Sequence, residues 1–167
     1  MSADAIVHEL LNTTLNLKVI QALGADIAIN GQIDRSRVAA KVFKDPKLLS
    51  ALEALVHPAV FQEIEKLYKA ACQTDQYTLF IVEIPLLFEI HAESNYDAVI
   101  AVLANETVAK RRFVAGGHTL QDYEQRMHRQ LSPQTKSANA TYTIHNNGSL
   151  EELKHQVAQL HDILILE

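Results

Sequence analysis

Apolar residues recur at helical spacing through the first part of the chain. The spacing predicts helices over Ala5–Leu11 and Leu15–Leu23, and Gly24 is well placed to end the second one. The dipeptide Asn30-Gly31 lies between apolar residues, which indicates a tight turn. The pattern therefore predicts two helices followed by a hairpin-like turn.

Polar residues that precede apolar runs indicate where the next two helices begin. Asp34 or Ser36 can cap one helix, and Asp45-Pro46 starts another, because proline is tolerated in a first helical turn. We expect that second helix to reach about Val56, and a separate helix to follow Pro58.

Three later segments have the pattern of buried strands. Residues 78–84 (TLFIVEI) and 98–103 (AVIAVL) are short, continuous and β-branched, as parallel strands covered on both faces tend to be, and 141–145 (TYTIH) is a weaker candidate. The helical stretches among and after them are 106–114, 120–131 and 150–164. The alternation predicts one α/β domain over residues 1–167 with a parallel sheet, and the long helical region before residue 78 as a lobe over the sheet's edge.

Composition fits that prediction and limits the partners. The 167 residues are 48% hydrophobic, which suits a single compact core, and the net charge of -5 argues against a protein that coats nucleic acid. A single cysteine, Cys72, excludes an internal disulfide, and no Cys/His group has zinc spacing. No apolar run is long enough for a membrane span, and Met1–Asp4 does not resemble a signal peptide. We therefore expect a soluble cytoplasmic protein.

Two carboxylates have positions that suit chemistry. Glu83 falls at the carboxyl end of the first expected strand, where α/β folds bind ligands, and could orient a hydroxyl or a metal-bound water. It could equally be a partly buried Glu held by backbone donors. Asp4 lies just before a helix, where capping is the commoner role for an aspartate.

Basic residues and turns supply the remaining candidates. Lys110-Arg111-Arg112 follows the second expected strand, but helical periodicity lets at most one or two of these side chains share a site. Arg126 and Arg129 add positive charge on the next helix. Asn146-Asn147-Gly148 is ordinary turn chemistry when taken alone.

The order of these motifs is more specific than any one of them. They are Ser2-Ala3-Asp4, Asp34-Arg35, Val56-His57-Pro58, Val82 to Glu89 (VEIPLLFE), Glu106 with Arg111, Arg126-Met127 with Gln130, and Ile144 with Asn146-Asn147-Gly148. Read together, they resemble the dephospho-coenzyme A kinase family along essentially the whole chain. The resemblance implies a P-loop NTPase-like three-layer fold, with a helical acceptor lobe at about 5–77 and a lid with flanking helices at about 105–140.

The resemblance also implies a reaction, the transfer of the γ-phosphoryl group of ATP to the ribose 3′-hydroxyl of dephospho-coenzyme A, with Mg²⁺. It makes Asp4 the base and sets Glu83, where many relatives have Asp, on the magnesium side. It makes Arg111 and Arg126 the lid arginines that neutralise the transferring phosphoryl group.

The same resemblance implies where the two substrates bind. Arg35 and His57 belong to the lobe that holds the acceptor, together with Pro85 and Leu86 of the VEIPLLFE segment. Asn147 in its turn lies by the adenine of ATP.

Two departures from the family pattern stand out. Ala115 occupies the place of a second lid arginine, for which Arg112 is a possible substitute. No Gly-x-x-x-x-Gly-Lys-Ser/Thr loop occurs, and Gly116-Gly117 lacks the Lys-Ser/Thr. We expect that the sequence starts late by about 30 residues, the size of one strand–helix–strand unit, and that the shortened chain is inactive and poorly stable. The alternatives are a non-catalytic binding protein and another small-molecule kinase of the same fold.

Overall fold

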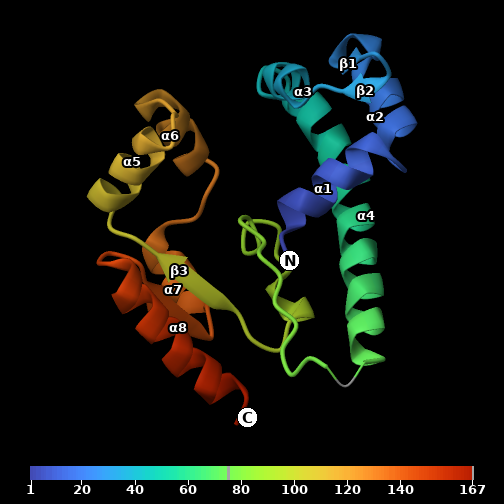
Figure 1. Ribbon diagram of the computed structural model, residues 1–167. Coiled ribbons are helices and arrows are strands. Elements are labelled where there is room, and N and C mark those ends of the chain that lie inside the picture. Colours follow the sequence, from blue (N-terminus) through green and yellow to red (C-terminus); the bar gives the residue numbers. More distant parts are fainter. Residues whose placement is uncertain (75, 167) are drawn as a thin grey trace. The chain divides into compact units, whose positions relative to one another are not determined.

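A computed structural model describes residues 1–74 and 76–166. The chain forms two compact units, Met1–Ile84 and Pro85–Glu167, and each is described here by itself (Figure 1). No helix in the described parts of the chain is long and apolar enough to cross a membrane.

Unit 1 (Met1–Ile84) is a cluster of four helices, α1 (Ala3–Asn12), α2 (Asn16–Leu23), α3 (Arg35–Val42) and α4 (Pro46–Cys72). The long helix α4 packs against each of the other three, which Figure 1 shows gathered around its first half. The buried side chains form one apolar core: Ala3, Ile6, Leu10, Leu11, Leu15, Val19, Leu23, Ile27, Ile33, Val38, Val42, Val56, Val60 and Ile64.

The short connection between α2 and α3 follows the predicted turn chemistry. A 3-10 turn, η1 (Ala25–Ile27), leads into a hairpin of β1 (Ala28–Ile29) and β2 (Gln32–Ile33). Asn30 and Gly31 have φ values of 51° and 78° at its tip, the left-handed conformation that a two-residue hairpin loop requires. Of the two caps considered for α3, Asp34 is the one used, since its side chain accepts from the Arg37 N–H.

The prediction of two helices meeting at Pro58 is wrong. Helix α4 continues from Pro46 to Cys72 with Pro58 inside it. Proline removes one backbone donor, but Val56, Val60 and Ile64 on both sides of it are buried in the same core. Packing of one continuous apolar face therefore outweighs the local cost of the proline.

The prediction of a strand over residues 78–84 is also wrong. In the described structure this segment has a single parallel bridge, Ser2 with Glu83. The Glu83 N–H donates to the Met1 carbonyl, and the Ala3 N–H donates to the Glu83 carbonyl, each at 2.9 Å. Ile81 is 61% exposed, so the segment is not covered on both faces as the sequence indicated. A run of β-branched residues shows strand propensity but does not supply the neighbouring strand that a ladder needs.

Unit 2 (Pro85–Glu167) is built on two parallel strands, β3 (Ile100–Leu103) and β4 (Tyr142–His145). This confirms the parallel pairing expected for the later strands. The helices of this unit are α5 (Glu106–Ala115), α6 (Leu120–Met127), α7 (Pro133–Asn139) and α8 (Leu150–Leu164), with a short 3-10 turn, η2 (Glu93–Asn95). Helix α7 packs against β3, and α8 packs against β4.

Helix α7 was absent from the prediction, which ran one helix from 120 to 131. The structure ends α6 at Met127 and begins α7 with Ser132 as its cap and Pro133 in its first turn. The Ser-Pro pair is a helix start signal that the sequence contained.

Helices α5 and α6 form a pair of their own, joined to the rest of unit 2 by one segment that enters α5 and one that leaves α6 (Figure 1). The Phe113 ring stacks on His118 at 4.5 Å and meets Tyr123 edge-on at 5.7 Å. A capping box between Thr119 and Asp122 starts α6. The pair thus has an aromatic contact and a fixed turn that hold its two helices together.

The carboxyl end of β4 is covered by a side chain from α8. Gln156 Oε1 accepts from the His145 N–H at 3.0 Å, and Gln156 Nε2 donates to the His145 carbonyl at 2.9 Å. One amide therefore satisfies both backbone groups of the last strand residue.

Candidate functional site

In unit 1 the predicted carboxylates lie at the start of α1. Ser2, not Asp4, is the N-cap residue of α1, and Asp4 lies exposed in the first turn. There the positive end of the helix dipole favours a carboxylate. Glu83 is also exposed, and its backbone bonds to Met1 and Ala3 bring it beside the helix start that carries Asp4. Among the described residues, no group of three His, Cys, Asp or Glu is arranged to hold a metal ion.

The other two candidates in unit 1 lie on separate helices. Arg35 is the exposed first residue of α3, and His57 is half-buried in the middle of α4. Helices α3 and α4 pack against each other, so both candidates belong to the same helical cluster.

The segment Pro85–Ala92 opens unit 2 as a compact turn. Backbone bonds run from the Ile90 N–H to the Leu86 carbonyl and from the Ala92 N–H to the Leu87 carbonyl, both at 3.1 Å. Phe88 is buried, while Pro85 is exposed and Leu86 is half-exposed. The turn therefore leaves Pro85 and Leu86 accessible to solvent, while the buried Phe88 side chain fixes it to unit 2.

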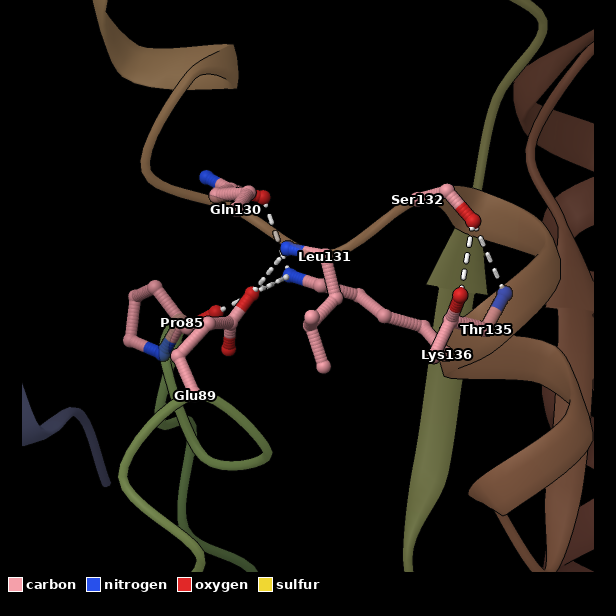
Figure 2. Close-up of polar contacts among 7 residues, drawn as sticks. All are labelled: Pro85, Glu89, Gln130, Leu131, Ser132, Thr135 and Lys136. Atoms are coloured by element: carbon pink, nitrogen blue, oxygen red, sulfur yellow. Dashed lines mark hydrogen bonds and ion pairs between the residues drawn. The ribbon is translucent and has the colours of Figure 1, made fainter.

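Glu89, at the end of the VEIPLLFE segment, makes an ion pair that is largely enclosed by protein. Its Oε1 lies 3.1 Å from Lys136 Nζ on α7 and accepts from the Leu131 N–H at 2.7 Å (Figure 2). Lys136 Nζ also donates to Gln130 Oε1 at 2.9 Å and to the Pro85 carbonyl at 3.3 Å. Burial pushes the pKa of Glu89 upward, but the bonds from Leu131, its own backbone and Lys136 outweigh it, so the pKa is lowered.

Arg111 and Arg126 lie on α5 and α6 of the same helical pair, and both are exposed. The Arg126 guanidinium lies over the Phe113 ring, 5.2 Å from its centroid, which restricts its orientation. Arg112 instead reaches the Asn-Asn-Gly turn. It donates to the carbonyl of Asn146 at 2.7 Å and to that of Gly148 at 3.2 Å. These contacts hold the Arg112 guanidinium at that turn.

Asn147 lies in the turn that Arg112 contacts. Its Oδ1 accepts from the Asn105 N–H at 2.6 Å, just before α5 begins. The side chain therefore ties the end of β4 to the start of the helical pair.

Comparison with known proteins shows the family to which the chain belongs. The sequence model of the dephospho-CoA kinase family matches residues 1–152. The chain belongs to the dephospho-CoA kinase family. It is 40% identical to the dephospho-CoA kinase of Chlamydia pneumoniae, over 95% of this chain and 80% of that one. It is also 40% identical to the Protochlamydia amoebophila enzyme, over 98% of this chain and 83% of that one.

Solved structures agree with the sequence comparison. The crystal structure of TT1252 from Thermus thermophilus superposes with a TM-score of 0.82 at 28% identity, covering 98% of this chain and 83% of that chain. Dephospho-CoA kinase from Campylobacter jejuni gives a TM-score of 0.69 at 25% identity, covering 97% and 82%. The α/β, P-loop NTPase-like fold predicted from the sequence is confirmed.

Membership of the dephospho-CoA kinase family gives the reaction. The enzyme is a kinase that acts at the last step of coenzyme A biosynthesis, with ATP and dephospho-CoA as its substrates. The structure adds two residues to the sequence candidates, Glu89 of the Pro85–Ala92 turn and Lys136 of α7, and it gives Arg112 a contact with the Asn-Asn-Gly turn. Glu89 was visible in the VEIPLLFE motif, but Lys136 carried no sequence signal because its helix was not predicted.

Proposed function

We propose that Arg111 and Arg126 of the α5–α6 pair, which we call the lid, stabilise the phosphoryl group as it passes from ATP to the ribose 3′-hydroxyl of dephospho-CoA. The observation that carries this proposal is that both arginines are exposed on one small helical pair joined to unit 2 by two segments. Phosphoryl transfer needs cations placed around three charged oxygens, and a guanidinium can bind two of them at once.

Asp4 is proposed as the group that accepts or orients the proton of the acceptor hydroxyl. Its exposed position in the first turn of α1 supports this, because the carboxylate is accessible to a substrate. No ion pair with a described residue neutralises it, so it is available as a hydrogen-bond acceptor.

Mg²⁺ is proposed to enter with ATP and to be bound by Glu83 through a carboxylate oxygen. Mg²⁺ prefers oxygen ligands and commonly takes one or two carboxylates together with phosphate oxygens and waters. Glu83 beside the start of α1 fits that modest requirement, since a cage of three protein ligands is not needed. When bound, the ion supplies charge neutralisation at the phosphates.

Four residues are proposed, each by itself, as contacts of the acceptor: Arg35 and His57 of unit 1, and Pro85 and Leu86 of unit 2. Arg35 offers an exposed guanidinium for its phosphate groups, and His57 offers an imidazole on α4. Pro85 and Leu86 are the accessible residues of the turn anchored by Phe88, and they offer apolar contact.

Asn147 is proposed to contact the adenine of ATP. Its Oδ1 is engaged by the Asn105 N–H, which leaves the Nδ2 amino group as the donor for a ring nitrogen. We also propose a cytoplasmic location, in keeping with the prediction made from the sequence.

An assay with ATP, Mg²⁺ and dephospho-CoA, following ADP and coenzyme A, tests the proposal. In a form of the protein that carries a P-loop, Asp4→Asn should lower kcat by about 10²–10⁴-fold, as expected for loss of a general base, with little change in acceptor binding. Glu9→Gln, an exposed carboxylate on the same helix, is the matched control and should leave kcat unchanged.

The outcomes separate the alternatives. An unchanged kcat in Asp4→Asn would reject Asp4 as the base. In the form that carries a P-loop, binding of dephospho-CoA without transfer would favour a non-catalytic binding protein, and transfer to a different hydroxyl compound would favour another kinase of this fold.

A further inference from the structure

Two segments join the lid to the rest of unit 2. In each segment, a backbone N–H donates a hydrogen bond to a side-chain oxygen from elsewhere in the unit. On the entering side, the Asn105 N–H donates to Asn147 Oδ1 at 2.6 Å. On the leaving side, the Leu131 N–H donates to Glu89 Oε1 at 2.7 Å. The first bond comes from the proposed adenine turn, and the second comes from the turn that carries Pro85. Each end of the lid is therefore tied to an element proposed to hold one substrate.

The leaving side is the more strongly charged of the two. Glu89 and Lys136 make an ion pair of 3.1 Å, and their side chains are only 12% and 15% exposed. Lys136 also donates to Gln130 Oε1, next to Leu131, and to the Pro85 carbonyl (Figure 2). We call this group of five residues, Pro85, Glu89, Gln130, Leu131 and Lys136, the clasp.

The two oxygens of Glu89 are used unequally. Oε1 takes the bonds from Leu131 and Lys136, while Oε2 is buried with no hydrogen-bond partner in the described part of the chain. A buried carboxylate without a counter-ion is costly, so its charge depends on Lys136. Lys136 depends less on Glu89, because Gln130 and Pro85 would still accept from its ammonium group.

We propose that Glu89 and Lys136 are positioning residues that fix the lid, and with it Arg111 and Arg126, relative to the Pro85–Leu86 segment. This inference rests on the proposed lid function of the two arginines. The clasp joins three pieces of the chain that the reaction needs in register: the acceptor-side turn, the segment that leaves α6, and helix α7. Neither residue touches the reacting atoms in this proposal. They act through the orientation of the lid, because misplacing a cation by about 1 Å is enough to slow a transfer strongly.

A simpler role would be general stabilisation of unit 2, and the two roles differ in what they affect. A general stabiliser protects β3, β4 and α8 as much as the lid. A positioning clasp protects the lid and its leaving segment selectively, since those are the amides it ties.

Hydrogen exchange of the full chain, read by peptide mass spectrometry, distinguishes these roles. In Lys136→Met the amides of 120–131 should exchange about tenfold faster or more, because a charged hydrogen bond is lost and a buried charge is left unpaired. Glu89→Gln should have a smaller effect, because it removes the charge itself, and Lys136→Arg should remain close to wild type.

Helix α8 of the same unit supplies both the control variant and the amides for comparison. Glu151→Gln breaks an exposed Glu151–Lys154 pair of 2.9 Å on α8 and should leave lid exchange unchanged. Unchanged lid exchange in Lys136→Met would overturn the proposal. Equal acceleration of α8 amides would also overturn it, because that is the signature of general stabilisation.

Kinetics supply the second readout. Lys136→Met should lower kcat about tenfold while the KM values for ATP and dephospho-CoA stay within about twofold, and Lys136→Arg should restore kcat. A raised KM with an unchanged kcat would contradict a positioning role. These kinetics use a form of the protein that carries a P-loop, because the chain without that loop is expected from its sequence to be inactive. If that form transfers no phosphoryl group to dephospho-CoA, the proposed function fails, while the exchange measurement still decides whether the clasp fixes the lid.

Discussion

Different interactions stabilise the inside of each of the two units of this kinase. Unit 1 has one continuous core to which all four helices contribute, and Val19 and Ile27 within it are fully buried. In unit 2 the buried apolar residues among those described are Phe88, Ala92, Ala101, Tyr123, Ile144 and Leu160. Its longer connections are made by polar groups, including Arg112 to the Asn-Asn-Gly turn and Glu89 to Leu131.

Because unit 1 is stabilised mainly by apolar burial and unit 2 also by polar contacts, the two units should respond differently to pH and to substitution. Apolar burial is non-directional and insensitive to pH, so it maintains shape but does not fix the angle of an exposed arm. Hydrogen bonds and ion pairs are directional and respond to protonation, which suits the unit that must orient the lid. We expect core substitutions to change the stability of unit 1 and polar substitutions to change the activity that depends on unit 2.

The largest effect on stability should come from Ile27→Ala. Ile27 is 0% exposed, so truncation leaves a cavity in the core of unit 1 and should cost about 3 kcal/mol of unfolding free energy. Hydrogen exchange under denaturant should show this loss in α4 and a smaller loss in α8. Equal losses in both helices would mean that the units unfold together, and the contrast drawn here would fail.

Arg126→Lys should come next and should act on activity alone. Lysine keeps the charge but cannot make the paired bonds of a guanidinium and stacks less well on Phe113, so kcat should fall about 10–100-fold. Thermal unfolding should be nearly unchanged because Arg126 is exposed. A large fall in Tm with normal kcat would assign Arg126 to structure.

A pH titration of stability should show the contribution of Glu89. Its pKa in the folded protein is lowered from 4.5, so the ionised carboxylate stabilises the fold fully above about pH 4.5, and this contribution is lost as the pH falls through the lowered value. The difference in unfolding free energy between wild type and Glu89→Gln should therefore shrink below pH 4.5. Glu106 and Asp122 also have lowered pKa values, but they are common to both proteins and cancel. A difference that stays constant from pH 7 to pH 3 would contradict the assignment.

The smallest effect on stability should come from Asn147→Ala. It removes the bond to the Asn105 N–H in an exposed part of the molecule, where one hydrogen bond contributes about 1 kcal/mol or less. Exchange of the first α5 amides should rise modestly, and KM for ATP should rise if the side chain contacts adenine. Arg112→Ala is the companion variant, since it loosens the same turn without removing Asn147.

Much of the fold could be read from local patterns. The Asn30-Gly31 turn and the Asp34 cap depend on residues close in sequence, and strand β3 follows a clear apolar run. The errors came from non-local packing. The core holds α4 continuous across Pro58, and the strand-like pairing of residues 78–84 is, among the described residues, limited to the Ser2–Glu83 bridge.

The candidate site was predictable only through the order of its motifs. Asp4 and Arg126 are exposed residues of ordinary type, and nothing local separates them from surface charges. The clasp was harder still, because Lys136 lies on a helix that was not predicted, and Glu89 and Leu131 are 42 residues apart. Long-range polar contacts of this kind leave no periodicity in a sequence.

The amide of Gln156 has a consequence for association between molecules. A strand end with a free N–H and a free carbonyl can pair with a strand of another chain, which is a common start of aggregation. Gln156 fills both positions at His145 from a helix. In Gln156→Ala the strand end would be open to such pairing, so a single side chain helps to keep neighbouring molecules of this kinase apart at high concentration.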